Sequence, residues 1–372
     1  MKILISGASG FIGSHLTQVL SRQYENVACV RNPRHLTNRF VAINTVTVDF
    51  SANPGVEDWL PLLQGVDVVI NTVGIISESR RQTFEQLHHK APCTLFQACE
   101  QTKVRKVIQI SALGADETAF SPYHLSKKAA DDDLQHRDLD WVIIKPSLVY
   151  GPGGKSAAFF KALSALPLLP VVDTGEQLVQ PVHIDDLTDT ICALLSSEAP
   201  VRLSIDVVGP SPIGFKDMLL QYRHWLGIIS DRVLHAPYPL ALLAAKAGGF
   251  LGNTILSGEA IQMLKRGNTG DVSIMQQLLH ITPRTLATVL SEQPAVQADR
   301  WHARLLFLRP LLRIAIGLLW LFTGMVSLGL YPIEQSYVLL SEMGLHGWSA
   351  PLALYGAALL DMGLGIATLS RF

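Results

Sequence analysis

The chain has 372 residues, which is enough for two or three domains. Its 30 Lys and Arg residues almost balance its 31 Asp and Glu residues, so no basic field would attract nucleic acid, and we expect no DNA or RNA partner. Only 16% of the residues are charged and the mean hydropathy is +0.28, which excludes an ordinary soluble enzyme and predicts an apolar region besides the core.

The N-terminal sequence MKILISGASGFIGSHL predicts a strand, a glycine-rich turn and a helix. Gly7 permits a tight turn, Gly10 lets a pyrophosphate approach the backbone, and Gly13 lets the helix pack closely on the sheet. A glycine-rich turn can also simply join two elements. The strand before it and the helix from about Phe11, whose free amides face an anion, favour a dinucleotide-binding site.

Residues 1–150 alternate short apolar runs with helical patterns. Parallel strands need helical crossovers and covered faces, so this alternation predicts an α/β fold, a Rossmann doubly wound parallel sheet with segments reaching about residue 190. The predicted strands are Ile3–Ser6, Asn26–Val30, Thr45–Val48, Val66–Asn71, Val107–Ile110 and Trp141–Lys145.

The second predicted strand ends in VACVRNP, where an NAD-preferring protein would carry an acidic residue for the ribose hydroxyls. Arg31 stands there instead, and Arg34 follows. A guanidinium matches a 2′-phosphate, so NADP is favoured, with NAD as the alternative. Two solvated surface arginines would give the same pattern.

Three residues at the end of the fifth predicted strand and in the next helix are candidates for a catalytic site. Tyr123 and Lys127 in YHLSK share a helix face, and Ser111 at the end of a strand precedes the tyrosine by 12 residues. A phenol titrates near pH 10, so proton transfer at neutral pH needs a nearby positive charge, which Lys127 could supply. The alternative is an exposed helix face and a serine satisfied by backbone.

Several polar clusters are expected to have no catalytic function. We expect His88 and His89 on a polar helix face and residues 131–133, three aspartates, as a solvated run. His183 with Asp185 and Asp186 resembles a metal or acid/base cluster, but the aspartates suit the start of a helix, and no metal site is expected.

Residues 151–300 predict a smaller substrate-side α/β region that closes over the carboxyl ends of the strands. Its predicted elements are a strand at Leu203–Val207 and helices at Ile184–Leu195 and Phe215–Leu226.

Residues 305–372 predict a helical membrane hairpin. Leu311–Tyr331, with Arg313 as its only charge, and Ala350–Leu369, with Asp361, are each long enough to cross a bilayer, although a pair of core helices is the alternative. Arginines flank both stretches, whereas the loop Pro332–Trp348 has neither Lys nor Arg, so both ends are expected in the cytoplasm of a bacterial inner membrane.

The four cysteines form no CxxC pair and lack histidines at metal-ligand spacing, so we expect buried, reduced thiols. The first predicted strand starts at Lys2 or Ile3, which leaves no room for a signal peptide, so the N-terminal domain is expected in the cytoplasm. The cysteines are Cys29, Cys93, Cys99 and Cys192.

These motifs together resemble the short-chain dehydrogenase/reductase superfamily in its extended or atypical branch, which includes epimerases and dehydratases. ISALGA followed by SPYHLSK is most similar to the group of the NADPH-binding accessory subunit of respiratory complex I. The matching segments are GASGFIG (7–13), VDF (48–50), NTVG (71–74), ISALGA (110–115), YHLSK (123–127), KPSLVYGPG (145–153) and PVHIDDL (181–187).

The resemblance implies a function for each matching residue. In catalysis, Ser111 would polarise a substrate carbonyl, Tyr123 would exchange a proton with its oxygen, and Lys127 would bind the nicotinamide ribose and lower the tyrosine pKa. The implied cofactor contacts are Gly7, Gly10, Phe11, Ile12 and Gly13 at the pyrophosphate, Asp49 and Phe50 at the adenine, Val73 and Gly74 along the middle, and Pro146 and Val149 near the nicotinamide.

The C-terminal segments RPLLRIAIGLLWLFTGMVSL, YP and LYGAALLDMGLG resemble the DoxX-like family. That family normally carries four membrane helices, whereas two fit here, so the domain is either shortened or completed by self-association or a partner chain. An acid at membrane depth needs a partner, and Arg313 is the predicted partner of Asp361.

The resemblance and the membrane segment predict a membrane-tethered NADP(H)-dependent oxidoreductase or epimerase acting on a carbonyl or secondary alcohol. The tether favours a small, apolar substrate such as a lipid or a quinone-like molecule. The alternative is a non-catalytic NADPH-binding membrane protein with a redox-sensing or assembly role.

Overall fold

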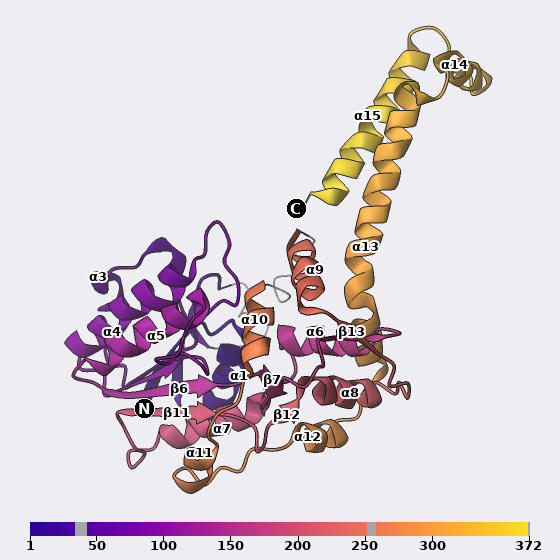
Figure 1. Ribbon diagram of the computed structural model, residues 1–372. Helices are drawn as coiled ribbons and strands as arrows, with labels where there is room; N and C mark the ends of the chain where they lie inside the picture. The colour runs from indigo at the N-terminus through magenta and orange to yellow at the C-terminus, as the bar shows by residue number, and fades with distance from the viewer. Residues whose placement is uncertain (34–42, 251–257, 371–372) are drawn as a thin grey trace. The chain divides into compact units, whose positions relative to one another are not determined.

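The computed structural model describes residues 1–33, 43–250 and 258–370. Its main sheet has seven parallel strands in the order β11-β6-β5-β4-β1-β2-β3, with β6 and β11 labelled side by side in Figure 1, which confirms the doubly wound sheet. The order reverses between β1 and β4, and ligands of such sheets bind at this point. The strands are β1 (Lys2–Ser6), β2 (Glu25–Val30), β3 (Asn44–Thr47), β4 (Val68–Asn71), β5 (Lys106–Ile110), β6 (Asp140–Pro146) and β11 (Leu203–Val207).

Both faces of the sheet are covered because successive side chains of a strand point to opposite sides. On one face, Ile3 and Ile5 of β1 share a buried cluster with residues of α1 (Phe11–Leu20), α7 (Ile184–Leu194) and α11 (Ser273–Gln277). On the other, Leu4 shares a cluster with residues of α3 (Val56–Trp59), α4 (Ala91–Gln101) and α5 (Pro122–Gln135).

Strand β11 lies beyond the residues expected to belong to the sheet. It pairs in parallel with β6, with Asp206 opposite Lys145, and forms an edge of the main sheet. The chain therefore leaves the sheet after β6, builds part of the substrate-side region and returns to complete the sheet.

The substrate-side region has a core of its own. Its helices α6 (Lys155–Ser164), α8 (Phe215–Trp225) and α12 (Leu286–Glu292) pack around buried Leu169 and Tyr222. Its paired strands are β7 (Val149–Tyr150) with β10 (Val182–His183), β8 (Leu169–Val172) with β13 (Val233–Ala236), and β9 (Leu178–Val179) with β12 (Ile213–Gly214). Helices α9 (Tyr238–Phe250) and α10 (Gly258–Arg266) follow β13.

Residues 301–372 form a second compact unit, distinct from residues 1–300. Helix α13 (Gln297–Met325) continues into η3 (Val326–Leu330), and α15 (Ser349–Leu369) returns. The segments 297–330 and 349–369 have apolar windows of mean hydropathy 1.9 and 1.6 and are long enough to cross a membrane. The expected connecting loop contains a further helix, α14 (Ile333–Glu342).

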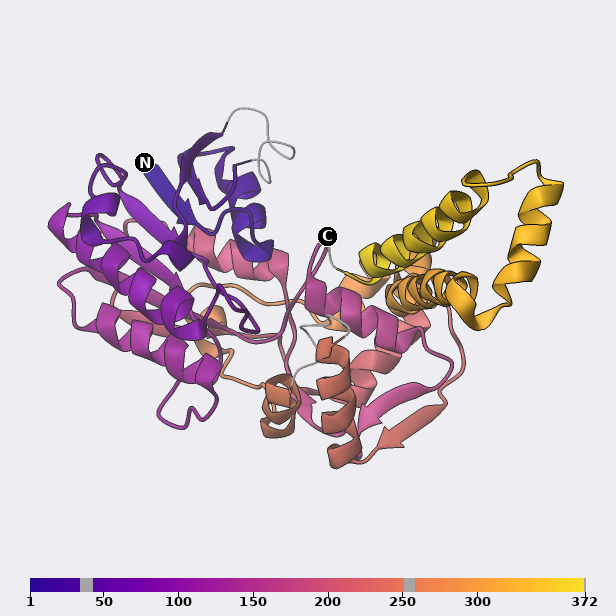
Figure 2. The same cartoon turned by 90° about the horizontal axis from the view of Figure 1, so that it is seen from above.

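Small residues line the contact between α13 and α15, which run side by side (Figures 1 and 2). A Cβ atom on Gly317 would lie 2.6 Å from Leu369, and one on Gly365 would lie 2.7 Å from Leu321. Backbones this close are typical of membrane helix pairs, where small side chains permit tight packing.

The predicted pairing of Arg313 with Asp361 is wrong. The Arg313 guanidinium donates to the carbonyl oxygens of Thr368 and Ser370 at the end of α15. The last carbonyls of a helix have no partner within it, so an arginine on the neighbouring helix satisfies them.

Candidate functional site

The glycine-rich turn after β1 forms a cradle for an anion. Gly7 has φ +72°, and its carbonyl accepts from the amide of Gly10 at 2.8 Å. Gly10 precedes α1 with no side-chain cap, and among the described residues the amides of Phe11 and Ile12 have no acceptor. These amides at the positive end of a helix suit a pyrophosphate.

Gly13 is the tightest point of this cradle. A Cβ atom there would lie 2.3 Å from the Gly7 carbonyl oxygen and 2.7 Å from Oγ1 of Thr72. The Thr72 hydroxyl in turn donates to the carbonyl of Ser6 at 2.7 Å, which joins β1 to the end of β4. The sequence did not single out Thr72, although it follows a predicted strand directly.

The residues predicted to contact the adenosine end of the cofactor differ in exposure and in their contacts. Arg31 is exposed just after β2, and Arg34 lies outside the described residues. Asp49 caps η1 (Phe50–Ala52), where its carboxylate accepts from the amide and hydroxyl of Ser51 at 2.9 and 2.6 Å. The Phe50 ring is buried against Trp59, so it belongs to the core and does not offer a face to adenine.

Three polar residues of helix α5 form one stripe along it. Ser121 caps the helix by accepting from the amide of His124, and Pro122 occupies the first turn. Tyr123, Lys127 and Asp131 follow at intervals of four residues, so their side chains share a face.

Lys127 is buried and fixed by carbonyl groups. Its ammonium donates to the carbonyls of Val73, after β4, at 3.2 Å and Ile110, at the end of β5, at 2.9 Å. Burial lowers the pKa of Lys127 to about 8, and the Asp131 carboxylate opposes this shift. Gly74 leaves room for the ammonium, since a Cβ atom on it would lie 3.2 Å from Nζ.

Ser111 has a hydrogen-bond partner within the protein. Its hydroxyl donates to the carboxylate of Asp131, two turns of α5 beyond Tyr123. The expectation that residues 131–133 form a solvated run is wrong for Asp131, which is 2% exposed. Burial raises the pKa of Asp131 to about 7.

His88 is buried, which corrects the expectation of a polar helix face. It lies in the π-helix η2 (Glu85–Lys90), and its ring stacks on Phe84 and meets the edge of Tyr123. Its Nε2 accepts from the amide of Ile75 at 2.9 Å, so Nδ1 carries the proton and donates to the Ser126 hydroxyl. Burial, together with the Lys127 charge, lowers the pKa of His88 to about 2.

Tyr123 is half-buried between aromatic rings. The ring centroids of Phe84, His88 and His124 lie 5.2 to 5.7 Å from its own. Burial and the Asp131 carboxylate raise the pKa of Tyr123 to about 12, so the phenol keeps its proton at neutral pH.

A polar cavity of about 480 Å³ lies beside this stripe, with His124 in its wall. Its charged lining residues are Asp116, Lys145, Asp206 and Arg266. Of the two residues predicted near the nicotinamide, Pro146 is buried at the end of β6 and Val149 is half-buried in β7.

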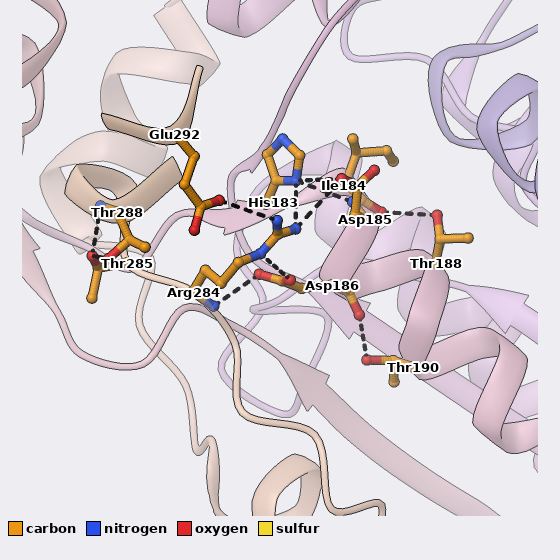
Figure 3. A network of polar contacts seen from close by, with 10 residues as sticks. All are labelled: His183, Ile184, Asp185, Asp186, Thr188, Thr190, Arg284, Thr285, Thr288 and Glu292. Carbon is orange, nitrogen blue, oxygen red and sulfur yellow. Dashed lines mark hydrogen bonds and ion pairs between the residues drawn. The ribbon is translucent and has the colours of Figure 1, made fainter. Parts of the chain in front are cut away.

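The cluster around His183 has a structural function (Figure 3). Arg284 donates through its amide and Nε to the two carboxylate oxygens of Asp186, both at 2.9 Å, and its guanidinium lies 3.0 Å from Nδ1 of His183. His183 also caps α7 by accepting from the amide of Asp185. The described residues contain no group of three His, Cys, Asp or Glu side chains that could hold a metal ion.

The comparisons with known proteins agree with this architecture. The family described as NAD(P)H-binding matches residues 7–159, and the DoxX-like family matches residues 317–372. UDP-glucuronic acid 4-epimerase from Bacillus cereus, solved with UDP-glucuronic acid and NAD, has a TM-score of 0.62 at 21% identity over 82% of this chain and all of that chain. The chain thus contains a Rossmann-type NAD(P)-binding domain, whose fold it shares with this epimerase, and a DoxX-like C-terminal domain.

Its curated relatives include reductases and complex I subunits. Ceramide reductase from Caulobacter vibrioides is 24% identical over 245 residues, which are 65% of this chain and 75% of that protein. NADH dehydrogenase [ubiquinone] 1 alpha subcomplex subunit 9 from Arabidopsis thaliana is 26% identical over 267 residues, or 68% of this chain. The match spans 64% of that subunit and 63% of its rat counterpart, just under two thirds of their length.

Proposed function

We propose that this protein is a membrane-tethered, NADP(H)-dependent oxidoreductase that reduces a carbonyl or oxidises the corresponding secondary alcohol. The observation that carries the proposal is the stripe on α5: a phenol, Tyr123, one turn before an ammonium, Lys127, that is fixed to the ends of β4 and β5. Epimerisation by oxidation and re-reduction of one carbon would use the same residues.

The cradle residues fit a dinucleotide. The free amides of Phe11 and Ile12 and the close approach at Gly13 would hold its pyrophosphate, and Lys127 would bind its nicotinamide ribose. When bound, the nicotinamide supplies or accepts the hydride. Arg31, exposed after β2, would contact a 2′-phosphate, which supports NADP over NAD.

Tyr123 would move the proton at the substrate oxygen. Its pKa of about 12 keeps the phenol protonated at neutral pH, so it is ready to donate to a carbonyl in the reducing direction. The Lys127 ammonium would stabilise the phenolate that remains. Ser111 bonds to Asp131, so we assign it a positioning function in holding that carboxylate beneath Lys127.

Two substitutions test the proposal with the full chain in detergent or lipid discs. Tyr123→Phe should lower the rate of NADPH oxidation with a carbonyl substrate by about 100-fold or more while leaving NADPH affinity close to wild type. Lys127→Met should lower both the rate of NADPH oxidation and the affinity for NADPH. If wild-type protein binds NADPH but reduces no carbonyl in a panel of ketones, aldehydes and quinones, the oxidoreductase proposal is rejected.

A second candidate function is a non-catalytic NADPH-binding protein with a sensing or assembly role. It is favoured by the Ser111 hydroxyl, which donates to Asp131, and by the similarity to complex I subunits. In this case the Tyr123→Phe variant would fully restore growth of a gene-deletion strain, whereas the Gly13→Ala variant would not.

We also propose that α13 and α15 cross a bacterial inner membrane, with the N-terminal unit in the cytoplasm. Arginines at positions 300, 304 and 309 precede the first apolar stretch, and the segment between the spans lacks Lys and Arg. Self-association through the helix pair would supply a four-helix membrane domain. Cysteine labelling at position 345 from the outside and cross-linking in lipid discs test these two points.

A further inference from the structure

The polar cavity beside α5 contains hydrogen-bonding groups that the protein itself leaves unused. His124 is 3% exposed, its Nδ1 lies 2.9 Å from the Ser121 hydroxyl, and its Nε2 has no partner among the described residues. The side-chain oxygen of Asn268, another lining residue, is buried and equally unpartnered. Buried polar atoms without partners are costly, so two in one cavity indicate a ligand that completes them.

Two cationic and two anionic side chains line the cavity. Lys145 and Asp206 are opposite each other on β6 and β11, and both line it. At its other side Arg266 pairs with Asp116 at 3.4 Å. Asp206 accepts from the amide of Asp271, whereas Lys145 makes no ion pair in the part of the chain that the structure describes.

His124 contributes no charge to this balance, because burial and the Arg266 guanidinium both lower its pKa. An anionic ligand would therefore meet two carboxylates, and a cationic one would meet an ammonium and a guanidinium. An uncharged group with donors and acceptors would meet neither repulsion and could use Lys145, Asp206, His124 and Asn268 together.

We propose that this cavity binds the uncharged, hydroxyl- or amide-bearing head of the substrate whose carbonyl reacts at Tyr123. Tyr123 does not itself line the cavity, but the lining residue His124 follows it in α5, and their ring centroids are 5.2 Å apart. The volume of about 480 Å³ is within the range of small-molecule sites. The inference rests on the proposed function. It adds an uncharged polar head to the small, apolar substrate expected from the sequence.

Three probes built on one 2-amino-3-keto alcohol test the charge preference. They are a short-chain N-acyl-2-amino-3-keto alcohol, the same compound phosphorylated on its primary hydroxyl, and the free amine. Binding to the full chain in lipid discs with saturating NADPH is measured by calorimetry. We expect the neutral probe to bind at least about tenfold more tightly than either charged probe. Tighter binding of a charged probe, or binding of none of the three, overturns the inference.

Variants separate this inference from the proposed function. Lys145→Met should weaken binding of the neutral probe by about tenfold or more and leave NADPH affinity unchanged. Lys103 is an exposed lysine outside the cavity, so the matched control Lys103→Met should change neither affinity. Unchanged probe affinity in Lys145→Met overturns the inference alone. Absence of NADPH binding or of any carbonyl reduction in wild-type protein rejects the proposed function instead.

Discussion

The cradle around Gly13 gives the sharpest test of nucleotide binding. In Gly13→Ala the new Cβ would lie 2.3 Å from the backbone oxygen of Gly7 and 2.7 Å from the Thr72 hydroxyl, so the turn must move by about 1 Å to reach ordinary contact. Overpacking of this kind costs about 1–3 kcal/mol. In Gly10→Ala the corresponding distance to Gly7 is 3.1 Å, which a shift of a few tenths of an ångström relieves.

The two variants should therefore separate folding from binding. We expect Gly13→Ala to lower Tm by several degrees, at about 2–4 °C for each kcal/mol, and to abolish NADPH binding. Gly10→Ala should keep a nearly wild-type Tm but lose at least about tenfold in affinity, because its methyl group stands where the pyrophosphate approaches the backbone. Calorimetry and thermal unfolding in detergent measure both, with Gly363→Ala, which has open space around its Cβ, as the control. Wild-type affinity in both variants would refute the assignment of the cradle.

Three further outcomes are expected. Arg284→Met should lower the free energy of unfolding by about 1.5–3 kcal/mol, because the buried Asp186 carboxylate keeps only a backbone donor. Adding Asp186→Asn to this variant should recover part of the loss, as measured by denaturant titration. The carbonyl-reducing rate should fall as pH rises through about 8, where Lys127 loses its proton. Asp131→Asn removes a negative charge that favours the Lys127 ammonium, so the rate should then fall at lower pH. If the pH of the fall does not change in this variant, Asp131 does not influence the pKa of Lys127 as assigned. Gly365→Val should disrupt the pairing of α13 with α15 and raise protease sensitivity, whereas Gly363→Val should not.

The sequence predicted the strands and the Tyr123–Lys127 pair because both follow simple periods. Apolar runs of four to six residues between helical patterns match the observed strands to within two residues, and a spacing of four places two side chains on one helix face. The same spacing continues to Asp131, but that signal was obscured by two further aspartates that do lie near the surface, paired with Lys128 and Arg137.

The remaining differences have identifiable physical causes. His88 lies in a π-helical turn, where the period of 3.6 residues used to assign helix faces does not apply. The burial of Phe50 depends on its contact with Trp59, nine residues later, and the bonding of Ser111 depends on a residue 20 positions away. Neither contact is visible in local patterns.

The return of the chain into the main sheet at β11 determines how the protein can be divided. A fragment ending near residue 190 would lack β11 and leave β6 as a long apolar edge with unpaired backbone groups, which invites aggregation. Expression of a nucleotide-binding fragment should therefore include residues to about 300, since the second half supplies a structural strand as well as a wall of the cavity. The nucleotide-binding and substrate-side regions, which look separable in the sequence, therefore fold as one unit.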